Sequence, residues 1–180
     1  MKTLADYVLH VKDVMPIDMC KDLISTYDAV AEKVQYENEG YNFGELNINL
    51  DEDFKPFRED MWYLMSSIHK FYIEKTQAQI PESQSYEAPR IKRYEPNEGF
   101  FDWHLDSCNI QTAKRSLVMF WYLNDVNEGG ETIFDVGSEI AIKPEAGSVV
   151  CFPPNYLYPH KGAMPISNPK YVISSYVNLP

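Results

Sequence analysis

The segment His104-Leu105-Asp106 contains two residues of types that bind metal ions, with one residue between them. Side chains alternate along a β-strand, so the imidazole of His104 and the carboxylate of Asp106 are expected on the same face. Two such donors can share one ion. The motif is short and often arises by chance, so it indicates a metal site only together with a third ligand.

The third ligand has to come from the remaining histidines, His10, His69 and His160. His10 lies in a polar N-terminal stretch, and His69 is expected to be a surface or boundary residue of a helix. His160 ends a predicted late strand, and in a jelly roll distant strands become neighbours across the mouth of the barrel. We therefore expect His104, Asp106 and His160 to bind one ion.

Two histidines and one carboxylate on one face of an octahedral ion leave three positions open, which is the facial triad of non-haem Fe(II) oxygenases. A 2-oxo acid can use two of these positions and O2 the third. A structural zinc site would instead close its coordination, usually with thiolates. Cys20, Cys108 and Cys151 are widely spaced and form no CxxC pair, so such a zinc site is not expected.

A chelated 2-oxo acid needs a cation for its far carboxylate, and two residues are candidates for that end of the site. Lys170 lies ten residues after His160, at the start of a β-branched segment. Tyr94 precedes His104 by ten residues, and its phenol could donate to the same carboxylate. The alternatives are a solvated lysine beside a turn and a core tyrosine.

The first 80 residues are predicted to be mostly helical. Apolar residues at spacings of three and four predict one helix at about 16–34 and a second at about 56–79. Residues 36–53 between them are polar with two glycines, and are expected to form a loop or hairpin. This connection is longer than most, which indicates either a lid over the substrate or a plain connection.

From about residue 86 the sequence consists of short β-branched and aromatic segments separated by turn residues. The predicted strands are 90–94, 100–106, 115–123, 131–135, 139–142, 148–152, 156–160 and 171–177. Eight short strands at near-regular spacing indicate a sandwich or jelly roll, with the helices packed on the outer face of one sheet. We expect a single domain over residues 1–180, with helical support over about 13–80 and a β core over about 86–180.

The bulk properties exclude several classes of protein. The net charge of −11 argues against a broad nucleic-acid-binding face. No apolar run approaches the length of about 20 residues that spans a bilayer, and the N-terminus lacks the apolar core of a signal peptide. We expect a cytoplasmic protein that binds neither membranes nor nucleic acids, with Cys20 and Cys151 in its core. The sequence does not indicate an oligomeric state.

The order and spacing of these segments resemble the prolyl 4-hydroxylase-like family of 2-oxoglutarate/Fe(II)-dependent dioxygenases, most of all its compact microbial or phage-encoded members. The resemblance covers about residues 90–177, roughly half of the chain. The matching stretches are 93–94, 99–107, 122–125, 128–134, 144–148, 152–153, 160–162 and 170–171.

The resemblance implies a mainly β fold, a double-stranded β-helix (jelly roll) with flanking N-terminal helices. It implies that His104, Asp106 and His160 hold Fe(II), that Lys170 pairs with the distal carboxylate of 2-oxoglutarate, and that Tyr94 donates to the same group. Thr132 is implied to line the cosubstrate pocket. Members of the family hydroxylate a substrate C–H bond with O2 while 2-oxoglutarate becomes succinate and CO2, and ascorbate rescues oxidised iron.

The resemblance favours a prolyl residue in a peptide or protein as substrate, but the sequence departs from the family in two places. Tyr176 stands near a position where many members carry tryptophan, and the segment between Asp106 and Ser116 is shorter than in peptide-binding relatives. A hydroxylase of a free amino acid or another small molecule is therefore the alternative. Outside enzymes, the alternative is a jelly-roll module that binds metal or a partner without turnover.

Overall fold

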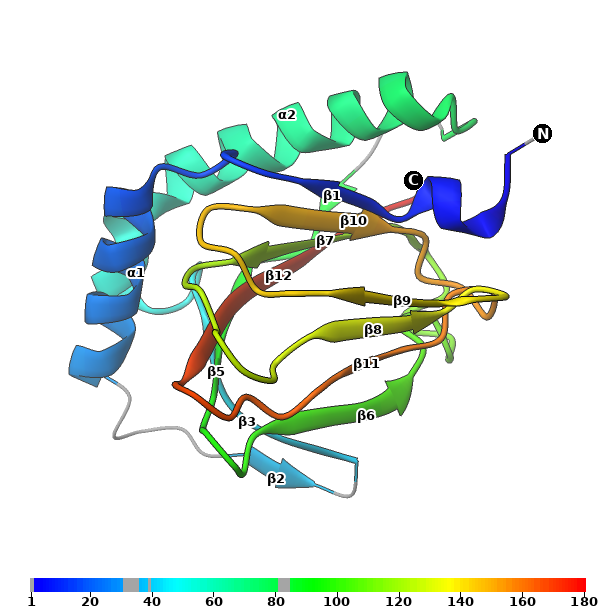
Figure 1. Cartoon of the computed structure of the whole chain (residues 1–180). Coiled ribbons are helices and arrows are strands. Elements are labelled where there is room, and N and C mark those ends of the chain that lie inside the picture. The colour runs from blue at the N-terminus through cyan, green and yellow to red at the C-terminus, as the bar shows by residue number, and fades with distance from the viewer. Residues whose placement is uncertain (1, 31–35, 39, 81–84) are drawn as a thin grey trace.

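The computed structural model of this chain describes residues 2–30, 36–38, 40–80 and 85–180, and these residues form helices followed by a large antiparallel sheet (Figure 1). The helices are η1 (Leu4–Tyr7), α1 (Ile17–Val30), η3 (Glu52–Phe57) and α2 (Arg58–Thr76). The strands are β1 (Leu9–Val11), β2 (Tyr36–Asn38), β3 (Tyr41–Asn47), β4 (Ser85–Tyr86), β5 (Arg90–Tyr94), β6 (Phe100–His104), β7 (Arg115–Tyr122), β8 (Thr132–Asp135), β9 (Glu139–Ile142), β10 (Val149–Phe152), β11 (His160–Gly162) and β12 (Lys170–Asn178).

The strands form one nearly closed sheet. Along the sheet they run in the order β1-β10-β7-β12-β5-β3-β6-β11-β8-β9, and neighbouring strands in this order are antiparallel. Strand β2 pairs with β3, and β4 pairs with β12. Strands that are distant in sequence thus become neighbours, as the pairs of β12 with β5 and of β11 with β6 show. The expected double-stranded β-helix with flanking helices is confirmed.

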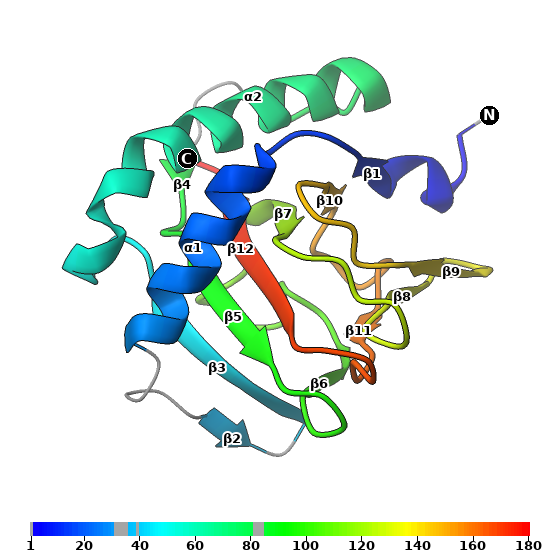
Figure 2. The same cartoon turned by 60° about the vertical axis from the view of Figure 1, so that its left-hand side comes forward.

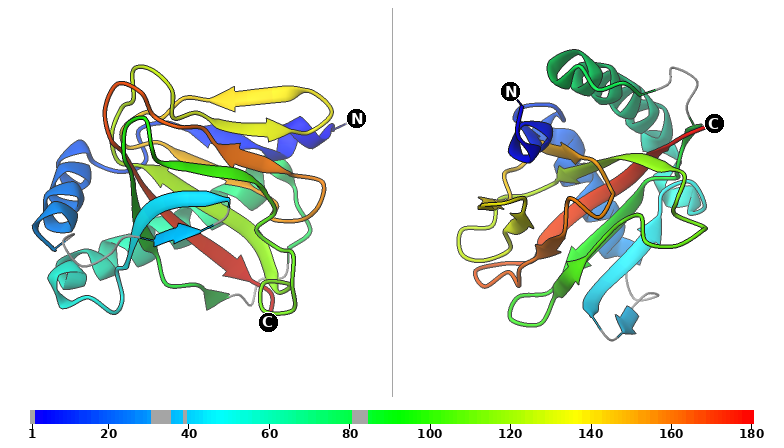
Figure 3. Two further views of the ribbon diagram at one scale, coloured as in Figure 1. Left: turned by 90° about the horizontal axis from the view of Figure 1, so that it is seen from below. Right: turned by 90° about the vertical axis from the view of Figure 1, so that its right-hand side faces the viewer.

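Helices α1 and α2 lie together against one side of the barrel, over β5, β7 and β12 (Figures 2 and 3). Each helix buries one face against the outer side of these strands, as the apolar spacing predicts. The buried residues of α1 are Cys20, Leu23 and Tyr27. None of the helices in the described residues is long and apolar enough to cross a membrane.

The structure corrects the predicted start of the second helix and the environment of one histidine. Residues 52–57 form the 3-10 helix η3, which contains Pro56, so α2 begins only at Arg58. It ends at Thr76, because Gln77 adopts a left-handed conformation with φ of 53°. His69 is buried rather than at the surface, and its Nδ1 lies 3.1 Å from the hydroxyl of Tyr86.

The first 80 residues are not as helical as predicted, since the described part of them contributes three strands, β1, β2 and β3, to the sheet. The expected connection at 36–53 contains the β2–β3 hairpin, with residue 39 outside the described residues. Strand β3 then lies inside the sheet, pairing with β5 through Gly44 and with β6 through Tyr41. A plain connection is therefore wrong. The expected hairpin is confirmed, but the mixed composition of β3 gave no sign that this strand continues into the sheet.

Two predicted strands in the second half also end differently. The strand expected at 156–160 is wrong, because residues 153–159 form turns and β11 begins at His160. Strand β6 ends at His104, so Asp106 lies in a bend after the strand. The predicted strands at 90–94 and 139–142 agree with β5 and β9.

The core consists of two apolar layers that lie on either side of the strands. The outer layer fills the space between the helices and the sheet and contains Cys20 and Cys151, as expected. The inner layer fills the barrel and contains residues such as Tyr122 and Phe134. Alternation along β12 sends Ile173 outward into the first layer and Val172 inward into the second.

Candidate metal centre

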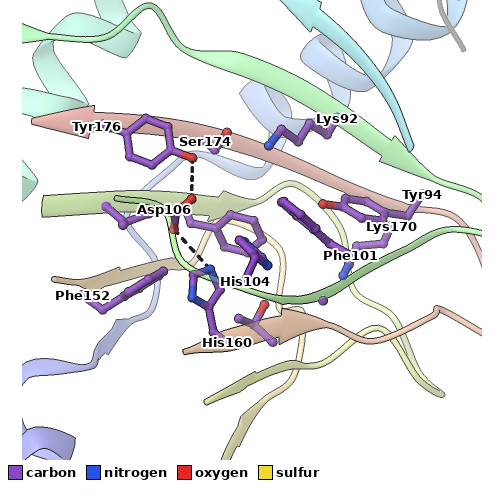
Figure 4. A pocket seen from close by; sticks show the side chains of 14 residues that line it. Lys92, Tyr94, Phe101, His104, Asp106, Phe152, His160, Lys170, Ser174 and Tyr176 are labelled. Atoms are coloured by element: carbon purple, nitrogen blue, oxygen red, sulfur yellow. Dashed lines mark hydrogen bonds and ion pairs between the residues drawn. The ribbon is translucent and has the colours of Figure 1, made fainter. Parts of the chain in front are cut away.

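His104, Asp106 and His160 come together on the wall of one cavity (Figure 4). His104 is the last residue of β6 and His160 the first of β11, and these two residues are direct partners in the antiparallel pair. One donor atom from each of the three residues lies within 4.8 Å of the others. Nε2 of His160 lies 3.2 Å from Oδ2 of Asp106. The spacing suits three ligands of one ion.

Backbone contacts set the tautomer of both histidines. Nδ1 of His104 lies 2.7 Å from the carbonyl oxygen of Asp102, and Nδ1 of His160 lies 3.1 Å from that of Tyr158. A carbonyl oxygen only accepts, so each Nδ1 carries the hydrogen and donates it. Each Nε2 is left with a lone pair, which is the arrangement found in histidines that bind metals.

The protonation states also suit a divalent ion. Burial, together with the neighbouring His160, lowers the pKa of His104 to about 4, so its imidazole is neutral at pH 7. Burial alone would raise the pKa of Asp106, but the two histidines and the hydroxyl of Tyr176 outweigh it and hold this pKa well below its usual range. Metal binding needs a neutral imidazole and an ionised carboxylate.

Tyr176 and Arg115 hold Asp106 in place. The hydroxyl of Tyr176 donates to Oδ1 of Asp106 at 2.8 Å, which leaves Oδ2 facing His160. The guanidinium of Arg115 lies 3.6 Å from the centre of the Tyr176 ring and donates to the backbone oxygen of Asp106 at 2.8 Å. Arg115 is itself fixed by two 2.8 Å contacts with the carboxylate of Glu87.

The same cavity contains the three residues expected at the cosubstrate end. Lys170 and Tyr94 face each other as direct partners of β12 and β5, with the Lys170 ammonium 4.3 Å from the centre of the Tyr94 ring. Thr132 also lines the cavity, and the hydroxyl of Tyr122 donates to its Oγ1 at 2.7 Å. The full lining is Lys92, Tyr94, Phe101, His104, Asp106, Val118, Phe120, Thr132, Phe152, His160, Gly162, Lys170, Ser174 and Tyr176.

Lys170 is a buried cation without a counter-charge. Its side chain is almost fully buried, and within the described residues no carboxylate lies close enough to form an ion pair with it. The ammonium donates instead to the carbonyl oxygen of Gly130 at 3.0 Å, with that of Ala163 at 3.5 Å. Burial lowers the pKa of Lys170 to about 7. An anion bound beside it would supply the missing charge.

A second, more open groove adjoins the cavity on its outer side. Lys92, Phe101, His104, Asp106 and Tyr176 border both spaces. The residues that border only the groove are Tyr41, Phe43, Glu45, Arg90, Leu105, Cys108, Thr112 and Arg115. Cys108 therefore lies near the site, exposed on the wall of the groove.

Comparison with protein families gives a match over the strands that build this site. The sequence model of the 2OG-Fe(II) oxygenase superfamily matches residues 89–178. The chain belongs to this superfamily. Oxygenases of this superfamily use Fe(II), 2-oxoglutarate and O2, and the present oxygenase carries a His-Asp-His site for the metal. A sequence search of curated proteins gave no match.

Several solved structures share the fold of this oxygenase. A viral collagen prolyl hydroxylase from Paramecium bursaria Chlorella virus 1, in complex with 2-oxoglutarate, superposes with a TM-score of 0.71 at 19% identity, covering 97% of each chain. A Pseudomonas putida prolyl-4-hydroxylase gives 0.72 at 17% identity, covering 97% of this chain and 94% of its own. A Trichoplax adhaerens prolyl hydroxylase bound to a hypoxia-inducible-factor peptide gives 0.75 at 14% identity, covering 96% and 84%.

Sequence reasoning missed three polar side chains of this oxygenase that face the site. Tyr176 was noted only as a departure from tryptophan, and Lys92 and Ser174 were not considered. A signal was available, because every second residue of a strand shares a face. Counting in steps of two from Lys170 reaches Ser174 and Tyr176, and from Tyr94 the same count reaches Lys92.

Proposed function

We propose that this oxygenase hydroxylates a C–H bond of a prolyl residue in a peptide or protein, with release of succinate and CO2. One observation carries the proposal: a triad of two histidines and an aspartate shares a cavity with a buried lysine that forms no ion pair within the described residues. A triad alone would suit many metal proteins. The lysine adds a place for the second carboxylate of a chelating 2-oxo acid.

In this proposal His104, Asp106 and His160 are the ligands of Fe(II). The donor set fits that ion, because the two imidazoles present free Nε2 atoms and Asp106 is ionised. When bound, Fe(II) would polarise the 2-oxo group and activate O2. The ring of Phe101 stacks on that of His104 at 3.4 Å and restricts its rotation. Tyr176 restricts Asp106 in the same way.

Three further residues are proposed to bind the cosubstrate. Lys170 would pair with the distal carboxylate of 2-oxoglutarate, Tyr94 would donate to the same group, and Thr132 would line its pocket. Burial strengthens the contact with Lys170, since a buried ion pair is little screened by water or salt. Phe101, Phe120 and other apolar residues form much of the remaining wall, which excludes water from the reacting groups. Ascorbate is proposed as a reductant that restores oxidised iron.

The choice of a prolyl substrate rests on the structural neighbours, which are prolyl hydroxylases, and on the character of the outer groove. Tyr41 and Phe43 stack on each other with ring centres 4.8 Å apart, and both contact Phe101 at the edge of the cavity. An aromatic wall of this kind suits the apolar ring of proline. A free amino acid is the second candidate, because Lys92 places a buried positive charge between the groove and the metal site.

The test is succinate formation by the Fe(II)-loaded enzyme with 2-oxoglutarate and O2. A proline-rich peptide should raise the rate above the background without substrate, and mass spectrometry should find a gain of one oxygen on proline. Stimulation by free L-proline but not by the peptide would favour the second candidate. His104→Ala and Asp106→Ala should abolish all succinate formation, and turnover that survives in either variant would contradict the ligand assignment.

A further inference from the structure

Lys92 is a buried lysine that takes part in neither the proposed binding of the metal nor that of 2-oxoglutarate. It lies on β5 two residues before Tyr94, so both side chains face the cavity. The direct partners across β5 and β12 are Tyr94 with Lys170, Lys92 with Val172, and Arg90 with Ser174. These three pairs follow one another from the proposed cosubstrate end of the cavity towards the outer groove. Lys92 occupies the step after Lys170, where the cavity meets the outer groove.

The polar groups around Lys92 are incompletely paired. Its only ion pair in the described part of the chain is with Oε2 of Glu45, and the distance of 3.5 Å exceeds that of a normal hydrogen bond. The hydroxyl of Ser174, a diagonal neighbour on β12, is buried and has no hydrogen-bond partner among the described residues. Figure 4 shows both side chains directed into the same side of the cavity. A buried hydroxyl without a partner, next to an ammonium with one long ion pair, indicates a place for a ligand oxygen.

The charged groups around the cavity and the groove sum to one uncancelled positive charge, even when the metal and 2-oxoglutarate are counted. Glu45 is shared by two cations, since it pairs with Arg90 at 2.9 Å as well as with Lys92. Farther along the groove, Arg115 is balanced by Glu87. At the inner end, the two charges of the ion and that of Lys170 would be balanced by Asp106 and the two carboxylates of 2-oxoglutarate. The trio of Arg90, Lys92 and Glu45 therefore keeps a net charge of +1 that neither the metal nor the cosubstrate removes.

We propose that Lys92, assisted by the hydroxyl of Ser174, binds a carboxylate of the primary substrate and thereby selects an anionic substrate. The inference rests on the proposed function, because it assigns the substrate side of the same site. Two sources would present this chemistry: the free α-carboxylate of an amino acid, or an acidic side chain next to the hydroxylated residue of a peptide. The surplus charge is local, because the chain as a whole carries −11.

Binding to the enzyme loaded with Mn(II) and 2-oxoglutarate under argon tests this proposal without turnover. Calorimetry would compare L-proline with L-prolinamide, and the peptide acetyl-Gly-Asp-Pro-Gly-amide with its Asn counterpart. The wild-type enzyme should bind the carboxylate member of at least one pair more tightly, by about tenfold to a hundredfold, as expected for a hydrogen bond to a buried charge. The pair that shows the preference identifies the source of the carboxylate.

Lys92→Met keeps most of the length of the side chain but removes the charged group, and should reduce the preference to about twofold or less. Affinities for Mn(II) and 2-oxoglutarate should stay unchanged. Lys143→Met removes an exposed lysine outside the cavity and groove and should leave the preference intact, which controls for net charge. If Lys92→Met fails to fold, Ser174→Ala provides the second test, with an expected loss of several-fold in the same preference.

Three results would overturn the proposal: no preference for any carboxylate probe in the wild-type enzyme, an unchanged preference in the folded variants, or weaker binding of 2-oxoglutarate alone in Lys92→Met. The last would assign Lys92 to the cosubstrate. Failure of the proposed function has a different signature. Absence of succinate in every turnover assay, with the carboxylate preference intact in calorimetry, would refute the oxygenase reaction and still support the anion site.

Discussion

Replacing Lys170 with methionine should make the metal-free protein more stable at pH 7 and should weaken the binding of 2-oxoglutarate by the enzyme. Methionine fills a similar volume but carries no charge, and Lys170 is almost fully buried without a carboxylate partner in the described residues. The folded protein tolerates this cation only at a cost, because burial opposes its charged form. The proposed role in binding 2-oxoglutarate would account for its presence, since a preformed buried cation suits a carboxylate of that dicarboxylate.

The magnitude follows from the change in the pKa of Lys170. The value is 10.5 for a free lysine and about 7 in the folded protein. The difference, 10.5 − 7 = 3.5, corresponds to a loss of at most about 5 kcal/mol of folding stability when the group is fully charged, and to about 4 kcal/mol at pH 7. The substitution also leaves the carbonyl oxygen of Gly130 without its donor, which costs about 1–3 kcal/mol. The net gain is about 2 kcal/mol, or about 4–8 °C in Tm.

The dependence on pH gives the prediction a distinctive sign. A lysine with a lowered pKa destabilises the folded state fully below pH 7, and this penalty disappears as the pH rises towards 10.5. The advantage of Lys170→Met should therefore shrink by about 3 kcal/mol between pH 7 and pH 9.5. At pH 9.5 the variant should therefore be about 1 kcal/mol less stable than the wild type, because the loss of the hydrogen bond to Gly130 then outweighs what remains of the burial penalty.

Urea unfolding of the metal-free proteins at pH 7 and pH 9.5 checks this prediction, with Lys143→Met as the exposed control. In turnover assays the KM for 2-oxoglutarate should rise about tenfold to a hundredfold in Lys170→Met, the effect of losing a charge-assisted hydrogen bond. A variant that is less stable than wild type at pH 7, with a difference that does not change with pH, would refute the reasoning about burial. An unchanged KM would refute the role in cosubstrate binding.

Three other substitutions test the supporting contacts. Tyr176→Phe removes the donor to Asp106 and should weaken Mn(II) binding about tenfold to a hundredfold, measured by titration, whereas an unchanged affinity would show that Asp106 needs no support. Tyr94→Phe should raise the KM for 2-oxoglutarate about threefold to tenfold at constant metal affinity, and no change would leave Tyr94 as a core residue. Thr132→Val removes the hydroxyl that accepts the 2.7 Å hydrogen bond from Tyr122, and should lower both Tm and the affinity for 2-oxoglutarate. A drop in Tm alone would indicate that Thr132 has a purely structural role.

Much of the metal site was predictable, because its chemistry depends on residue types that are rare in the chain. Only four histidines are present, and the spacing of His104 and Asp106 restricted the third ligand to a short list. The reasoning about Asp106 was nevertheless incomplete. Strand alternation predicted that Asp106 would face the same way as His104. In the structure β6 ends at His104, and a bend after the strand places Asp106 beside the two histidines.

Strand β3 shows where the sequence carried too little information. Its residues do not form a simple alternation of apolar and polar types, since Phe43 and Leu46 are buried three positions apart. Besides its local partner β2, the neighbours that hold β3 in the sheet are β5 and β6, which lie far away in sequence. A strand stabilised by pairing across such distances has a weak local signal. The outer groove, bordered by Tyr41, was missed for the same reason.

Lys92 shows the limit on predicting individual side chains. In the sequence it is one of two adjacent cations, Lys92 and Arg93, and either could point inward. The register of β5 against β12 decides the matter, because it pairs Tyr94 with Lys170 and so turns Lys92 into the cavity. Arg93 faces the other way, towards Asp28 and Glu95. A shift of one residue would have exchanged the two.

The visible absorption spectrum of the anaerobic enzyme tests the central claim most directly. Fe(II) and 2-oxoglutarate would be added to the metal-free protein under argon, with iron binding confirmed independently. We predict a weak charge-transfer band in the green region, because His104, Asp106 and His160 leave positions where the 2-oxo acid group can chelate the ion. The band should be lost in Asp106→Ala. Bound iron without any such band in the wild-type enzyme would contradict the proposed oxygenase mechanism.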